Sequence, residues 1–148
     1  MWFLPAIGGA LIGALITILI QARMTMRSMD VSALNDHIAQ VTTIEGLAVD
    51  YWLLDGKNEV AMELASAARL RGTLDASLAF RPTAERLFAA RFTEFKDADG
   101  ELFDTATGGG FETVGRLVDP ERAISVMQAA NLLRGMLREQ RRRIYWLH

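Results

Sequence analysis

The chain has 148 residues, of which 51% are hydrophobic and 23% charged, with 16 basic and 18 acidic side chains, two histidines and no cysteine. This length allows one domain of ordinary size, and the near balance of charge argues against a dedicated nucleic-acid binder, which carries a strong basic excess. Without cysteine there is no disulfide, thiolate nucleophile, iron–sulfur cluster or thiolate zinc site. Composition therefore excludes several chemistries and selects none.

The first 22 residues carry no ionisable side chain, and Thr17 is the only polar residue between Phe3 and Ile20. A helix of about 20 residues spans the roughly 30 Å hydrocarbon layer of a bilayer. The sequence therefore predicts a transmembrane anchor over residues 1–22. The alternative is a secretory signal peptide cleaved after Ala22, but no basic residue precedes the apolar run and the run is long for a signal peptide.

The charges that flank this run predict its orientation. Arg23 and Arg27 follow the run directly, and no basic residue precedes it. The positive-inside rule then places the N-terminus outside and everything after the anchor in the cytoplasm. We expect a single-pass protein of the cell membrane, with a juxtamembrane segment over 23–29 and a cytoplasmic helical domain over 30–148.

Small residues recur every three or four positions within the predicted anchor. Gly9 and Gly13 form a GxxxG step, which lets two membrane helices approach closely enough for their backbones to pack. The same face continues through Ala6, Ala10 and Thr17. We therefore expect a homo-oligomer formed through this face, although glycine is also frequent in membrane helices for other reasons.

Beyond residue 30 the hydrophobic spacing predicts helices and no strand. Apolar residues three and four apart begin at Val31 and end at Asp55-Gly56, where the glycine is a favourable helix stop. This first helix either continues from the anchor or restarts with Asp30 as its cap. Two further helices follow, with a stripe of phenylalanines expected in the core before a polar stretch at 96–100. The first three predicted helices cover 31–55, 58–80 and 82–95.

The strongest helix start lies near the C-terminus. Asp119-Pro120-Glu121 supplies a cap, a proline at the first helical position and an acidic first turn, so a helix is predicted over 120–146. Its apolar stripe follows four-and-three spacing: Val126, Ala130, Leu133, Leu137, Gln140, Ile144 and Leu147. The preceding segment, 101–118, has no regular pattern. The fold class is therefore predicted as all-α, a small bundle of three to four helices behind one transmembrane helix.

No pattern of catalytic or metal-binding residues stands out. His37 lacks the second histidine that a metal motif would need, and Asp97–Glu101 does not match a calcium loop, because Phe95 and Ala106 fall at the ligand positions. The glycine run 108–110 has neither the preceding strand nor the following Lys-Ser/Thr of a phosphate loop, which favours a flexible turn or a close backbone contact. We predict no catalytic residue, no cofactor and no metal.

The last predicted helix is strongly basic near its end. Arg134, Arg138, Arg141 and Arg142 share one flank with Tyr145, and Trp146 follows. Three interpretations remain open: a solvated face of the bundle, contact with anionic lipid at the cytoplasmic leaflet, or contact with an acidic partner or nucleic acid. Nucleic acid is the least expected of these partners because the whole chain is slightly acidic.

Together these patterns predict a membrane-anchored scaffold, adaptor or sensor that acts by association and is not an enzyme. Its expected partners are the lipid bilayer, a second copy of the chain and a cytoplasmic protein that the sequence does not identify. The alternative function is an oligomerising effector that disrupts membranes through the glycine face.

Overall fold

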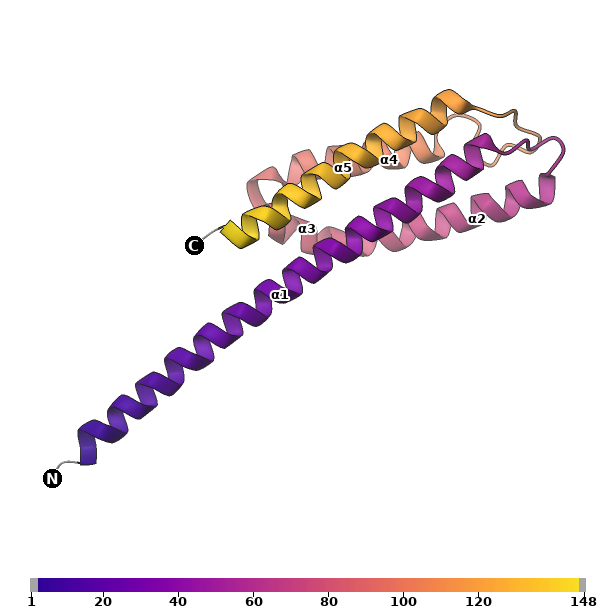
Figure 1. The fold of residues 1–148 in the computed structure, drawn as a ribbon. Coiled ribbons are helices and arrows are strands. Elements are labelled where there is room, and N and C mark those ends of the chain that lie inside the picture. The colour runs from indigo at the N-terminus through magenta and orange to yellow at the C-terminus, as the bar shows by residue number, and fades with distance from the viewer. Residues whose placement is uncertain (1–2, 147–148) are drawn as a thin grey trace. The chain divides into compact units, whose positions relative to one another are not determined.

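A computed structural model describes the backbone of residues 3–146 and the side chains of residues 13–145. Every described residue lies in a helix or in an irregular segment, and none of them forms a strand. The chain divides into two compact units, with the boundary between residues 32 and 33. The elements in chain order are α1 (Phe3–Leu53), α2 (Val60–Ser77), the 3-10 turn η1 (Leu78–Phe80), α3 (Arg81–Phe88), the 3-10 turn η2 (Ala89–Arg91), α4 (Phe92–Thr107) and α5 (Pro120–Trp146) (Figure 1).

The first unit contains only the N-terminal part of α1. Among the residues that the structure describes, no helix is both long and apolar enough to cross a membrane. Much of the predicted anchor, residues 1–12, lies outside the described side chains. The alternative that a new helix restarts at Asp30 is wrong, because α1 is helical without a break from Phe3 to Leu53. Neither glycine nor proline occurs between Gly13 and Gly46, so nothing in the sequence interrupts the helix there.

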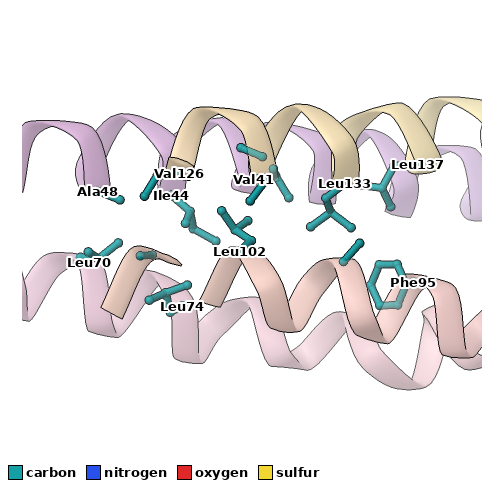
Figure 2. Close-up of a cluster of buried hydrophobic side chains, with 14 of the residues drawn as sticks. Val41, Ile44, Ala48, Leu70, Leu74, Phe95, Leu102, Val126, Leu133 and Leu137 are labelled. Atoms are coloured by element: carbon teal, nitrogen blue, oxygen red, sulfur yellow. The ribbon is translucent and has the colours of Figure 1, made fainter. Parts of the chain in front are cut away.

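The second unit is a compact helical bundle. The three long helices α2, α4 and α5 pack with the part of α1 that follows Ala33 around one hydrophobic core. Figure 2 shows side chains from all four helices pointing into a common centre. Full burial of a leucine or valine contributes roughly 1.5–3 kcal/mol, so this core is the main source of stability. Its largest fully buried apolar members include Trp52, Tyr51, Phe95, Leu34, Ile44, Leu70, Leu102, Leu133 and Leu137.

Helix α5 has the predicted bounds and the predicted buried stripe. Val126, Ala130, Leu133 and Leu137 are all fully buried, and Gln140 and Ile144 are partly buried. The predicted stripe also included Leu147, which lies outside the described residues. The start is fixed by Asp119, whose Oδ1 accepts a hydrogen bond of 2.9 Å from the backbone N–H of Arg122.

Helices α1 and α5 are antiparallel within the bundle. The backbone N–H of Asp119 donates to the carbonyl of Trp52 over 2.8 Å, and Arg141 Nη1 donates to Asn35 Oδ1 over 2.7 Å. Residues that are early in α5 thus lie beside residues that are late in α1. The C-terminal end of α5 therefore lies at the end of the bundle where α1 enters it.

The middle of the chain differs from the prediction. A polar stretch at 96–100 was expected to end a helix and residues 101–118 to be irregular, but α4 continues to Thr107. The reason is a buried stripe of residues spaced three and four apart, two of which are alanines: Phe95, Ala98, Leu102 and Ala106. The predicted third helix is instead broken at Ala89, whose φ of 45° is unfavourable for a residue with a Cβ. The core role of Phe88 and Phe95 is confirmed.

Candidate functional site

The predicted association face is only partly described. Gly13 lies in α1 with open space around the position of a Cβ atom, and the Thr17 hydroxyl donates to the Gly13 carbonyl over 2.9 Å. The side chains of the other members, Ala6, Gly9 and Ala10, lie outside the described residues. A hydroxyl that bonds to its own helix four residues back has its hydrogen bond satisfied within that helix.

The basic end of α5 carries two arginines that extend freely into solvent. Arg138 and Arg142 are four residues apart on one exposed side of the helix, and neither forms a hydrogen bond or ion pair with another described residue. Tyr145, 63% exposed, stands one turn further on. The side chain of Trp146 lies outside the described residues. This group of Arg138, Arg142 and Tyr145, together with the half-buried Arg141, is called the basic end.

Arg134, which the sequence pattern groups with these residues, does not belong to this exposed group. Its guanidinium forms an ion pair with Glu45 on α1 and also donates to Asn131 Oδ1 over 2.6 Å. Its side chain is only 12% exposed. Arg134 therefore ties α5 to α1. The sequence pattern could not show this, because the partner carboxylate lies 89 residues away.

A buried ion pair that the sequence analysis did not find closes the other end of the bundle. Arg116, in the segment before α5, lies with its Nε 3.4 Å from Glu63 Oε1 of α2, and their side chains are 6% and 2% exposed. The same guanidinium donates to the carbonyls of Trp52, Leu54 and Leu117 over 2.8–3.3 Å, and to that of Tyr51. These include carbonyls that the last turn of α1 leaves without helical partners. We call Arg116 and Glu63 the clasp.

Aromatic rings and a glycine complete the clasp. The Arg116 guanidinium lies 4.4 Å from the ring centroid of Tyr51 and 4.7 Å from that of Trp52, within the range of cation–π attraction. A Cβ atom at Gly56 would lie only 2.3 Å from Glu63 Oε2, so any side chain at this position would displace the Glu63 carboxylate. The clasp fixes the 112–119 segment against the end of α1, since Gly56 N–H also donates to the Arg116 carbonyl over 3.1 Å.

His37 is buried in a part of the core away from the clasp, and only one of its two ring nitrogens has a hydrogen-bond partner. Its ring stacks on Phe80 with centroids 4.0 Å apart, and Nδ1 lies 3.3 Å from Gln40 Oε1. Its Nε2 has no hydrogen-bond partner within the described part of the chain. Burial lowers the pKa of His37, while Gln40 and the carboxylate of Asp99 act against that shift. Burial also raises the pKa of Asp99, against the effects of His37 and Arg81.

The glycine run 108–110 is explained by close packing. A Cβ at Gly108 would lie 2.8 Å from Arg122 Nη1 and 2.5 Å from the Asp104 carbonyl, and Gly109 has a φ of +65°. The Arg122 guanidinium lies 5.0 Å from the Trp52 ring centroid. The run therefore makes a close backbone contact at Gly108 and also forms part of a turn at Gly109 and Gly110.

One open depression of about 550 Å³ lies along α4, lined by Lys96, Asp97, Gly100, Glu101, Asp104, Thr105 and Arg122. Within the described residues, no group of three His, Asp or Glu side chains is placed to hold a metal ion. No protein-family model, curated protein or solved structure matches the chain.

Proposed function

We propose that the chain is a single-pass membrane protein whose cytoplasmic bundle acts by association, with its basic end at the anionic surface of the inner leaflet. The apolar, uncharged residues 1–22 support the anchor, and Arg23 and Arg27 support the orientation. Self-association through the small residues of the anchor and binding of a cytoplasmic protein complete the proposal.

The antiparallel register of α1 and α5 carries the proposal. Arg141 bonds to Asn35, and only 13 residues separate Asn35 from residue 22, the end of the proposed anchor. In a helix this separation is about 20 Å, so only a short stretch of chain separates the proposed anchor from the end of the bundle that carries the basic end. A cation close to an anionic surface is attracted to it by about 1 kcal/mol, and this attraction falls off within a Debye length of about 8 Å. The proposal therefore requires the basic end to approach the leaflet to within that distance.

Membrane docking can be measured on the full chain, because the sequence has no cysteine. A single cysteine introduced as Tyr145→Cys and labelled with an environment-sensitive dye reports whether the basic end meets lipid. We expect a blue shift in phosphatidylcholine vesicles that contain phosphatidylserine, a smaller one in phosphatidylcholine alone, and loss of the difference at high salt.

The arginines are tested in the same labelled protein. Arg138→Gln with Arg142→Gln removes two cations and changes helix propensity little, so the docking equilibrium should fall by roughly 30-fold, or about 2 kcal/mol. The matched control is Arg69→Gln with Arg71→Gln on α2, which removes the same charge elsewhere. Equal effects of the two pairs, or a dye signal that ignores phosphatidylserine, would contradict contact between the basic end and lipid.

A further inference from the structure

The groups around the Arg116 guanidinium form a buried socket at the end of α1. The rings of Tyr51 and Trp52 and the Glu63 carboxylate of α2 line it. The carbonyl oxygens of Tyr51, Trp52 and Leu54 complete the lining. Aromatic faces, a carboxylate and carbonyl oxygens together suit a guanidinium, which is planar, charged and has five N–H donors. We call these groups, without Arg116 itself, the socket.

The segment that supplies the arginine, residues 112–119, has little else buried against the bundle. We call it the strap. Arg116 is the only buried residue of this fully described segment, and its aliphatic side chains are exposed: Val114, Leu117 and Val118. Its backbone forms hydrogen bonds with the end of α1, with Glu63 and with Gly56. Glu112 has a φ of 62°, which is unfavourable for a residue with a Cβ. One buried side chain therefore does most to hold the strap in place.

The socket is held by contacts that do not involve the strap. Trp52 Nε1 donates to the Ala106 carbonyl of α4 over 3.0 Å, and the Trp52 and Tyr51 rings meet edge to face with centroids 5.1 Å apart. Glu63 lies in the first turn of α2, where its N–H donates to the Glu59 carbonyl over 2.9 Å. A site whose groups are fixed before a ligand arrives binds it at a lower entropic cost. We therefore expect the socket to keep its shape when Arg116 is absent.

Arg116 does not use the Glu63 carboxylate fully. Arg116 Nε lies 3.4 Å from Glu63 Oε1, and neither atom has a hydrogen-bond partner among the described residues. The strongest guanidinium–carboxylate pairs form two parallel hydrogen bonds. Arg116 belongs to a backbone that is itself held, because the Gly56 N–H donates to the Arg116 carbonyl over 3.1 Å. A guanidinium that is not joined to the strap is free of this restraint and can approach Glu63 more closely.

We propose that the socket is a guanidinium-binding site which Arg116 occupies as an internal ligand, and that it accepts an external guanidinium on an aliphatic stem when the strap withdraws. An arginine side chain of another protein and a free guanidino compound share this chemistry. Withdrawal of the strap frees its aliphatic side chains from the end of α1. The inference concerns the bundle alone, so it goes beyond the proposed function and does not depend on the membrane anchor.

Chemical rescue of Arg116→Ala tests the site. The substitution removes the side chain beyond Cβ, and N-ethylguanidinium supplies the same missing atoms. In the full chain in mild detergent, this cation should raise the urea midpoint of Arg116→Ala in a saturable way, because it binds the folded state. Ethylammonium has the charge without the planar donors, so it should bind at least about tenfold more weakly. Adding Glu63→Gln should weaken binding of N-ethylguanidinium by about tenfold or more. If Arg116→Ala is unfolded in buffer, sucrose restores the folded state for the titration.

The matched control is Arg122→Ala. The Arg122 guanidinium also lies near Trp52, 5.0 Å from its ring centroid, but its side chain is 29% exposed and pairs with Asp119. N-ethylguanidinium should not restore this variant. The inference is overturned by the absence of a saturable rise for Arg116→Ala, by an equal rise for Arg122→Ala, or by equal effects of N-ethylguanidinium and ethylammonium.

Two further measurements complete the test. A blocked tripeptide with a central arginine that also binds Arg116→Ala would identify a protein side chain as a ligand, whereas binding of the small cation alone would assign the site to free guanidino compounds. Withdrawal of the strap is measured by hydrogen exchange in the unaltered chain. The amides of Glu112, Gly115 and Asp119 should exchange faster than that of Leu133 in the core, because the strap opens locally. Equal opening free energies would contradict withdrawal.

Discussion

Removal of the clasp arginine is the sharpest test of how this bundle is held together. In Arg116→Met the aliphatic stem is largely kept, but the guanidinium between Glu63 and the carbonyls of Tyr51, Trp52 and Leu54 is lost. Glu63, 2% exposed, then keeps the Gly115 N–H as a hydrogen-bond donor and has no cation beside it.

The expected cost follows from that geometry. Breaking a buried ion pair by removing one partner costs about 3–5 kcal/mol, because the remaining charge is uncompensated. The loss of hydrogen bonds to the last turn of α1 acts in the same direction. In the double variant Arg116→Met with Glu63→Leu no charge is left buried, so its cost should be smaller than that of Arg116→Met alone.

Urea unfolding of the full chain in mild detergent, followed by far-ultraviolet circular dichroism, measures both effects. Arg69→Met is the control, since Arg69 is an exposed arginine of α2 and its loss should cost less than about 0.5 kcal/mol. The reasoning is refuted if Arg116→Met unfolds like the control. It is also refuted if adding Glu63→Leu makes the protein less stable than Arg116→Met does.

Three further substitutions test the buried polar and backbone features. Burial lowers the folded pKa of His37 below 6.5, so the stabilisation from the neutral ring is complete above about pH 6.5 and is lost as the pH falls through the folded pKa. His37→Phe should abolish this loss of stability on acidification, and urea unfolding across this pH range measures it. The raised pKa of Asp99 acts in the opposite direction, because it favours the fold as the pH falls from the raised folded pKa of Asp99 down to the ordinary value of 3.8. Ala89→Gly should raise the unfolding free energy by about 1 kcal/mol by relieving a φ of 45°, and an unchanged or lower value would contradict the strain. Gly56→Ala should lower the unfolding free energy by about 1–3 kcal/mol, because the new methyl group displaces the Glu63 carboxylate from Arg116. In a protein that already carries Arg116→Met, where this ion pair is absent, the same substitution should cost less.

The sequence predicts elements well where local signals and burial agree. Helix α5 was located from Asp119-Pro120 and a stripe of large apolar residues, and both are found in the structure. The prediction ended this helix near residue 95, short of the observed end of α4 at Thr107, because two of its later core residues are alanines. A small apolar residue within a polar stretch gives little sign that its position is buried. Gly100 in the middle of α4 is half-buried and helical, although glycine costs about 1 kcal/mol inside a helix and usually suggests a helix end.

The candidate sites were harder to predict, because they depend on partners distant in the chain. Nothing around Arg116 distinguishes it from a solvated arginine, and its partner Glu63 lies 53 positions earlier. Arg134 and Arg138 look equivalent on a helical wheel, yet only Arg134 meets a carboxylate, Glu45. Side-chain spacing gives the face of a helix, but the packing of α1 against α5 decides which arginines remain exposed.

The central claim is that residues 1–22 anchor the chain in a membrane, and alkaline carbonate extraction tests it most directly. After expression with a C-terminal tag, the full-length chain should remain in the membrane pellet, because an uncharged run of 22 residues is long enough to span the hydrocarbon layer. Replacing Leu11 and Ile12 with Asp should release it, since these residues are at the middle of the run and each charge near the bilayer centre costs about 2.5–3.5 kcal/mol. Recovery of the unaltered chain in the supernatant, or of a chain that begins at Arg23, would contradict the account.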